Sequence, residues 1–278
     1  MRSIPRLDVG AVLIKMAALV LVLSYALPYL YLLMTSFKPA ADVQQIPPSF
    51  FPAVLSFENF RGVLLSSALP KAFGTSLTVA VLTTVLSLAV AVPAAFVATQ
   101  YRRRITTIFL LFALITRMVP SVALGVPLFQ LLKSLGLIDT LPGLVLAHTS
   151  AAVPLALLLM SAFFEGIPKE LEEAARMDGC TRFQAFRIII LPIMKGGIAV
   201  TALFTFITSW NEFLYALLLT SEATKTAPII IADYNSVYGL AWGPMTAAAV
   251  LYSLPVIIVT LALQKQIVGG LTFGAVKG

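Results

Sequence analysis

The stretch that decides the fold is residues 165–195, EGIPKELEEAARMDGCTRFQAFRIIILPIMK. It is too polar to cross a membrane and too long for a tight turn, but long apolar segments flank it on both sides. Pro168 can open a helix, because its missing N–H would be unpaired in the first turn. Gly179 can end that helix, because glycine tolerates the left-handed backbone found at helix C-termini. The stretch therefore predicts a short helix over 169–177, followed by a second helical stretch over 181–190.

The short helix is predicted to be amphipathic. Its apolar residues should form one small surface: Leu171, Ala174, Ala175 and Met177. Its charged residues should stay in water: Glu170, Glu172, Glu173 and Arg176. Such a helix, stopped by a glycine and centred on alanines, can serve as a docking element that a partner approaches closely. The alternative is an ordinary linker, which has no need of a preformed helix.

The composition indicates a membrane protein. Of the 278 residues 59% are apolar and only 11% are charged, against about 25% charged in soluble domains. A soluble fold of this size could not bury so much apolar surface. Apolar segments of span length predict an all-α integral membrane protein with six transmembrane helices. They lie at about 12–34, 72–98, 105–130, 142–164, 196–219 and 244–263.

These segments divide the chain into regions. Residues 1–11 form a cytoplasmic N-terminus, and 12–278 form a single transmembrane domain. Within that domain, residues 165–195 are the loop quoted above and 264–278 are a C-terminal tail. Two segments are expected on the external side: a proline-rich loop at 36–70, with a short helix near 57–65, and a loop at 221–243. The aromatic residues of the second loop indicate either a membrane interface or contact with an external protein: Tyr234, Tyr238 and Trp242.

The positive residues give the orientation. Most of the 19 Lys and Arg residues lie at one set of span ends, which includes residues 1–11 and the run Arg102, Arg103 and Arg104. The positive-inside rule then places both termini in the cytoplasm. It also accounts for the net charge of +7 without nucleic acid as a partner, for which no binding module is present. The single cysteine, Cys180, excludes an internal disulfide.

The quoted loop resembles a known motif. Glu173, Ala174 and Ala175 are followed at fixed spacing by Gly179, then by Ile189, Leu191 and Pro192. This pattern is similar to that of inner-membrane permeases of ATP-binding-cassette (ABC) importers. The resemblance implies a coupling helix that docks on a soluble ATPase, with these seven residues as the docking site. We therefore call residues 165–195 the coupling loop.

The same resemblance implies where ATP is hydrolysed. The chain has no G-x-x-x-x-G-K-[ST] phosphate loop, so ATP and Mg²⁺ are expected in a partner ATPase. No catalytic residue, metal site or bound cofactor is expected in this chain.

Other segments resemble a narrower branch of that family. Trp210, Asn211, Glu212 and Phe213, together with the C-terminal runs 268–272 and 276–278, are similar to maltose-type, MalG-like sugar permeases. This implies a type I importer fold, a carbohydrate as cargo, and the inner membrane of a bacterium or archaeon. It also implies partners: a second, MalF-like permease subunit, two nucleotide-binding ATPase subunits, an external solute-binding protein and membrane lipid. The glycine-rich tail would reach into the ATPase interface, or else be disordered.

Polar residues inside the spans are candidates for the substrate pathway, because charge in the bilayer is costly. Arg117 and Glu212 lie at depths that a long side chain can bridge, so we expect them either to pair in a hydrated cavity or to tie helices together. Asn211 and Trp210 can offer a sugar an amide and an aromatic face. The sole histidine, His148, cannot build a metal site alone, so a helix-to-helix hydrogen bond is expected. Prolines interrupt several spans and can kink them: Pro120, Pro127, Pro154 and Pro255.

Rival functions remain open at this stage. An ABC importer permease for a non-sugar solute would carry the same coupling loop. An ion-coupled secondary transporter would be expected to show inverted repeats and broken helices, and no duplicated pattern is visible. A membrane scaffold protein would need neither Arg117 nor Glu212 at depth.

Overall fold

The structure is a computed structural model that describes residues 9–66, 68–101, 104–236 and 239–275. Some residues used above lie outside this part: Arg102, Arg103, Tyr238, residues 1–8 of the N-terminus and residues 276–278 of the tail. The chain forms two compact units, which are treated separately below. One unit takes in the chain up to Leu69 together with Ile231–Tyr252, and the other takes in Pro70–Ile230 and the chain from Ser253 on.

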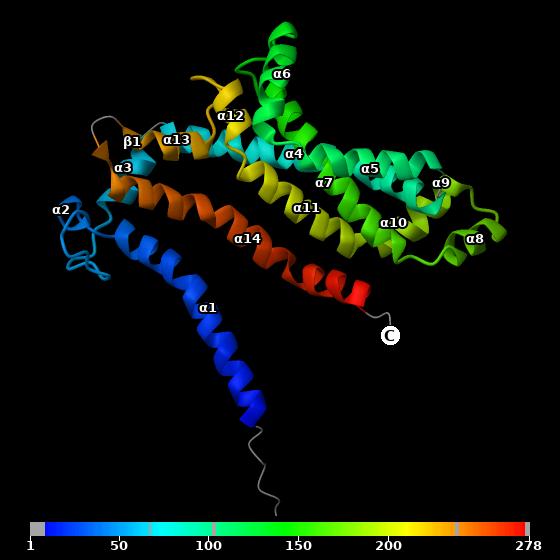
Figure 1. The fold of residues 1–278 in the computed structure, drawn as a ribbon, viewed down its shortest axis with the longest axis horizontal. Coiled ribbons are helices and arrows are strands. Elements are labelled where there is room, and N and C mark those ends of the chain that lie inside the picture. Colours follow the sequence, from blue (N-terminus) through cyan, green and yellow to red (C-terminus); the bar gives the residue numbers. More distant parts are fainter. Residues whose placement is uncertain (1–8, 67, 102–103, 237–238, 276–278) are drawn as a thin grey trace, which may run out of the picture. The chain divides into compact units, whose positions relative to one another are not determined.

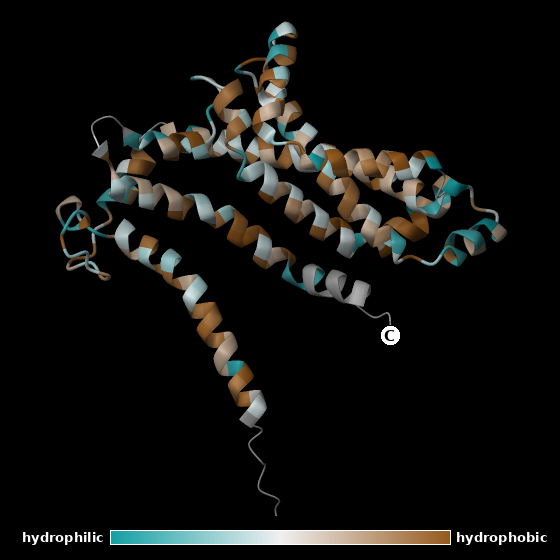
Figure 2. Ribbon diagram, in the orientation of Figure 1, coloured by the Kyte–Doolittle hydropathy of each residue, from teal (hydrophilic) through white to brown (hydrophobic). Residues whose placement is uncertain are grey.

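Long apolar helices dominate the described residues, as predicted (Figure 2). They are α1 (Val9–Ser36), α4 (Ala68–Gln100), α7 (Leu141–Glu165) and α14 (Trp242–Ala275). These 4 helices are long and apolar enough to cross a membrane, and two bent helix pairs raise the number to as many as 6. The apolar segments thus form helices of spanning length, but two of the six are not continuous.

The third predicted span is broken. The helices α5 (Arg104–Met118) and α6 (Ser121–Ser134) meet at 101°, where a single helix over 105–130 was expected. Pro120 causes the break, because it lacks an N–H, its ring clashes with the carbonyl four residues back, and it disfavours helical backbone at Val119. Pro120 has the extended ψ of 132° and takes the N-cap position of α6.

The fifth predicted span, 196–219, is also discontinuous. The helix α11 (Lys195–Trp210) ends within it, and α12 (Leu214–Leu219) starts after a break of three residues. The last predicted span, 244–263, is shorter than the observed helix, because α14 continues to Ala275. The backbone predicted as a tail is therefore helical over most of its length.

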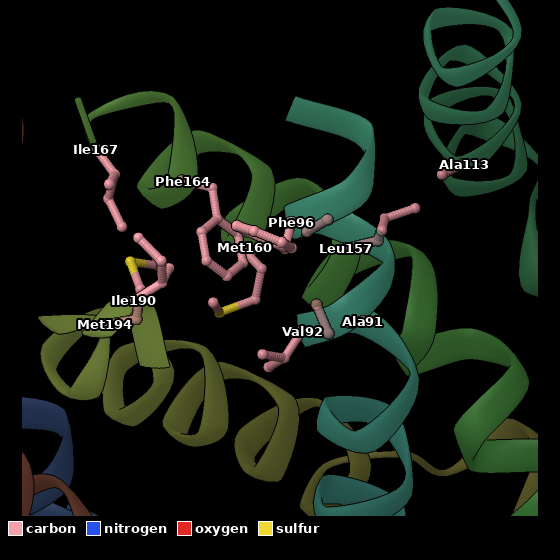
Figure 3. Close-up of a cluster of buried hydrophobic side chains, with 12 residues drawn as sticks. Ala91, Val92, Phe96, Ala113, Leu157, Met160, Phe164, Ile167, Ile190 and Met194 are labelled. Carbon is pink, nitrogen blue, oxygen red and sulfur yellow. The ribbon is translucent and has the colours of Figure 1, made fainter. Parts of the chain in front are cut away.

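The core of the second unit lies around α7, which packs against α5 and α11. Figure 3 shows Met160 and Phe164 of α7 facing Val92 and Phe96 of α4. Ile190, from the end of the coupling loop, completes this cluster and is fully buried. The loop that carries the docking motif is thus anchored in the same apolar core as the spans.

The first unit holds the proline-rich loop, with α2 (Ala40–Val43) and α3 (Glu58–Leu65). The predicted short helix near 57–65 is confirmed as α3. Asn59 of α3 is buried and donates to the backbone carbonyls of Ser36 and Lys38 at 3.0 and 2.9 Å. This amide therefore fixes the loop against the end of α1.

The second external segment, 221–243, contains the short helix α13 (Ala227–Asp233) and a two-stranded antiparallel hairpin. Its strands are β1 (Asn235–Ser236) and β2 (Gly239–Leu240), which the sequence did not predict. Trp242 starts α14 and is half exposed.

We predict that Gly197→Ala destabilises the fold. A Cβ at this position would lie 2.8 Å from Phe163 Cγ, so α11 could no longer approach α7 as closely. Overpacking of this kind typically costs about 1–3 kcal/mol, and thermal unfolding of the detergent-solubilised protein would report it as a lower Tm. Gly74→Ala in α4 is the matched control, because nothing lies within 4 Å of its Cβ. An unchanged Tm in Gly197→Ala would contradict the close packing of α7 and α11.

Candidate functional site

The coupling loop folds into a helix–turn–helix (Figure 1). Its first helix, α8 (Glu170–Met177), ends as predicted, because Gly179 has a φ of +85°. The N–H of Gly179 bonds to the carbonyl of Arg176 at 3.1 Å, and that of Cys180 to the carbonyl of Ala175 at 3.0 Å. This is the Schellman arrangement, which satisfies two carbonyls at the helix end. The turn is therefore fixed by local backbone bonds.

The two faces of α8 differ from the prediction. Leu171, Ala174 and Met177 are exposed and follow one another at helical spacing. Ala175, predicted to share this surface, is only 2% exposed and faces the chain itself. Glu172, predicted to stay in water, is 7% exposed.

The first four residues of the docking motif thus fall into an accessible group and a buried residue. Glu173, Ala174 and Gly179 are accessible, whereas Ala175 supports them from behind.

The second half of the loop is helical but not regular. Thr181 and Gln184 form a capping box at the start of α9 (Arg182–Ala185). A π-helical turn, η1 (Phe186–Ile190), precedes α10 (Leu191–Ile193). Such a turn fits next to Pro192, whose ring would clash with a carbonyl of a regular α-helix.

The last three motif residues lie in this half of the loop. Ile189 and Leu191 are half-buried, and Pro192 is exposed. The aliphatic pair therefore belongs to the packing of the loop on its own core.

A tyrosine that sequence reasoning missed holds the loop. Tyr101, directly after α4, donates from its hydroxyl to Glu172 Oε1 at 3.0 Å. The guanidinium of Arg182 lies 4.8 Å from the centre of the same ring. Burial raises the pKa of Tyr101, and the neighbouring Glu172 raises it further. Nothing in the sequence links Tyr101 to residues about 70 positions later.

A second polar group lies at the break in the fifth span. Glu212 accepts hydrogen bonds from the N–H groups of Tyr215 at 2.9 Å and Ala216 at 3.1 Å. It thereby satisfies two of the unpaired donors at the start of α12. His148 Nε2 lies 3.4 Å from Glu212 Oε2, and the two atoms do not form a hydrogen bond. His148 Nδ1 lies 2.9 Å from Ser209 Oγ, which confirms the predicted helix-to-helix hydrogen bond.

Arg117 does not pair with Glu212, and the pairing hypothesis is wrong. The Arg117 side chain is exposed, and its nearest partner is the carbonyl of Ala151, at 3.5 Å from Nη1. The guanidinium lines an open cavity of about 720 Å³ between α5, α6 and α7. Glu212 is not among the residues that line this cavity. Depth along a helix does not fix the direction of a side chain, so the comparison of depths did not predict a contact.

The two remaining pathway candidates have different surroundings. Trp210 is 1% exposed, stacks on Phe206 and meets Phe73 edge to face. It therefore cannot offer its face to a sugar in this conformation. Asn211 is exposed at the break between α11 and α12.

Asp139 forms a clasp that the sequence did not reveal. Its carboxylate accepts from the N–H and hydroxyl of Ser221, from the N–H and hydroxyl of Thr224, and from the N–H of Ala223. Burial raises the pKa of Asp139, but these hydrogen bonds outweigh burial and hold it well below its usual range. The clasp joins the turn before α7 to the segment after α12.

Comparisons with known proteins agree with this architecture. A family profile described as "Binding-protein-dependent transport system inner membrane component" matches residues 91–272. The trehalose transport system permease protein SugB of Mycobacterium tuberculosis is 38% identical over 262 residues, 93% of this chain and 95% of that protein. The diacetylchitobiose uptake system permease protein DasC of Streptomyces coelicolor is 33% identical over 270 residues, 97% of this chain and 98% of that protein.

The fold is also similar to that of solved structures. One of them is described as a bacterial ABC transporter involved in the import of the acidic polysaccharide alginate, and it matches with a TM-score of 0.77. The match covers 96% of this chain and 100% of that chain, at 24% identity. The overall fold of the chain is therefore that of a type I ABC importer permease.

We predict that His148 and Glu212 act as a pair and that Arg117 acts alone. In thermal unfolding, the losses of stability in His148→Ala and Glu212→Ala should fail to add by about 0.5–3 kcal/mol, because the side chains are in contact. Losses in Arg117→Ala and Glu212→Ala should add to within about 0.5 kcal/mol. Additive losses for the first pair would contradict the described contact.

We also predict that the Asp139 clasp weakens in acid. Because its pKa is lowered by folding, its stabilisation is complete above the unfolded value of about 3.9 and is lost as pH falls further. The Tm difference between the unmodified protein and Asp139→Asn should therefore be largest near neutral pH and shrink below about pH 4. Glu222→Gln is the control, since its side chain is 91% exposed. A difference that grows in acid would have the wrong sign.

Proposed function

Since the chain belongs to the family of binding-protein-dependent transport system inner membrane components, we propose that it forms half of the translocation pathway of an ABC importer for a carbohydrate. The observation that carries this proposal is the two-faced helix α8, which packs on α9 and η1 of the same loop on one side. Its other side presents Leu171, Ala174 and Met177 to a partner. Such a helix can transmit a push from outside the membrane to the spans.

The partner on this face would be a nucleotide-binding ATPase subunit. Ala174 lets the partner surface approach closely, and Glu173 and Gly179 flank it on the accessible side. Ala175, Ile189 and Leu191 would act from behind by keeping the loop in shape, and Pro192 would end it at the membrane. ATP and Mg²⁺ would bind in the partner, since this chain contains no phosphate loop.

The proposed importer contains further subunits. A second permease subunit would complete the pathway, a second ATPase subunit would serve it, and an external binding protein would deliver the solute. Both termini would lie in the cytoplasm, with lipid around the spans of an inner membrane. The positive residues of the coupling loop support this orientation, because Lys and Arg concentrate on the cytoplasmic side of membrane proteins.

A carbohydrate is supported by the relatives, which are named for trehalose and diacetylchitobiose. Within the chain, Asn211 is the best-placed contact, because an exposed amide at a helix break can bond to hydroxyl groups. Arg117 would contribute from the wall of its own cavity. Glu212 and Trp210 would shape the pathway indirectly, by fixing the break between α11 and α12.

The proposal predicts that Ala174→Trp separates the chain from its ATPase. The bulky ring would fill the space that docking needs, so the ATPase subunit should no longer copurify with the tagged permease from detergent-solubilised membranes. Ala41→Trp is the matched control, because Ala41 is also an exposed alanine of a short helix, α2, but lies in the external loop. Equal ATPase recovery with both variants would refute docking at α8.

The cargo is tested with the same purified complex and its external binding protein. Trehalose, maltose or diacetylchitobiose should stimulate ATP hydrolysis in proteoliposomes, whereas glutamine and phosphate should not. Stimulation by an amino acid or phosphate alone would keep the importer but replace the carbohydrate.

A further inference from the structure

The buried face of α8 meets the end of α4 through one directional contact. The Tyr101 N–H still bonds to the carbonyl of Val97 at 3.1 Å, so the residue continues the last turn of α4. Its hydroxyl reaches Glu172 of α8. Glu172 is almost fully buried although it is a carboxylate, and buried carboxylates are retained where they have a bonding partner. Tyr101 is that partner among the described residues.

The same ring also contacts the second helix of the loop. Arg182 of α9 stands over the ring at a distance typical of a cation–π contact. Tyr101 therefore touches α8 with its hydroxyl and α9 with its ring, on either side of the turn at Gly179. One side chain fixes both helices of the loop relative to α4.

The last turns of α4, just before Tyr101, are packed against α7 and η1. Phe96, one turn earlier, lies 5.6 Å from Phe164 of α7 and 4.7 Å from Phe186 of η1, centre to centre. These aromatic contacts are apolar and tolerate sliding, whereas a hydrogen bond to a carboxylate fixes distance and direction. Among the described residues, the hydrogen bond from the Tyr101 hydroxyl to Glu172 is therefore the directional contact that can hold α8 in one register against the end of α4.

We propose that Tyr101 is a positioning residue for energy coupling, which ties the docking helix α8 to the spanning helix α4 through Glu172. The inference rests on the proposed function, because it assumes that an ATPase docks on α8. When the docked subunits close, the displacement of α8 is passed to α4 at this bond. Without the bond, α8 can yield alone, and the closing motion reaches the spans less effectively.

The test uses Tyr101→Phe in the complete transporter, reconstituted in proteoliposomes with its external binding protein. This variant keeps the ring under Arg182 and removes only the hydroxyl. We expect the maximal rate of ATP hydrolysis to fall about tenfold or more, the usual scale for losing one hydrogen bond to a charged group. The KM for ATP and the amount of copurified ATPase should stay the same, since neither nucleotide nor docking surface is touched.

Matched variants separate positioning from simple damage. Glu172→Ala should lower the maximal rate as much as Tyr101→Phe, and the double variant should be no worse than either one. Glu172→Gln should restore most of the rate, because its amide oxygen still accepts from the Tyr101 hydroxyl. Tyr25→Phe is the control for the chemical change, since Tyr25 is 84% exposed in α1.

The outcomes distinguish a failure of the proposed function from a failure of the role of Tyr101. If the unmodified chain brings down no ATPase, the proposed function fails, and the inference fails with it. If the ATPase copurifies but Tyr101→Phe keeps the full rate, or if the losses in Tyr101→Phe and Glu172→Ala multiply, only the role of Tyr101 is overturned.

Discussion

Backbone polar groups inside a bilayer must find partners within the protein, and this constraint governs the second unit. An unsatisfied N–H or C=O in hydrocarbon costs several kcal/mol, so each break in a spanning helix needs its own repair. At the break after Trp210, the repair is the Glu212 carboxylate, which receives the first free N–H groups of α12. That carboxylate lies 3.4 Å from Nε2 of His148 of α7, whose ring is bonded to Ser209 of α11. Three helices are thus joined by one capping interaction.

Local features of the sequence predicted the parts of the fold that have local causes. Span length and hydropathy gave the membrane helices, and Pro168 and Gly179 gave the short helix of the coupling loop. Pro120 was named as a residue that can kink the third span, but a break as sharp as the one observed was not predicted, because prolines are often tolerated within membrane helices. The break after Trp210 was not predicted, because no proline or glycine marks it. Whether a helix breaks depends on which neighbours can satisfy the freed groups, and those neighbours are distant in sequence.

The site was predictable to the same extent. The accessible motif residues lie where the pattern implied, but the burial of Glu172 and Ala175 depends on Tyr101 and on the packing of α8, which helical periodicity alone does not contain. The pairing of Arg117 with Glu212 failed because depth along a helix says nothing about the direction of a side chain. The predicted helix-to-helix hydrogen bond of His148 is confirmed. Its contact with Glu212 could not be predicted, because it depends on how the helices are arranged in space.

Ala174 and Ala175 are neighbours in the chain, yet their side chains have different surroundings. Ala174 faces outward, whereas Ala175 is enclosed by its own subunit. Under the proposed docking, the size of residue 174 would be limited by the surface of a partner subunit. The size of residue 175 is limited by packing inside this chain. A docking variant is therefore interpretable at the first position, whereas a change at the second would also disturb the fold.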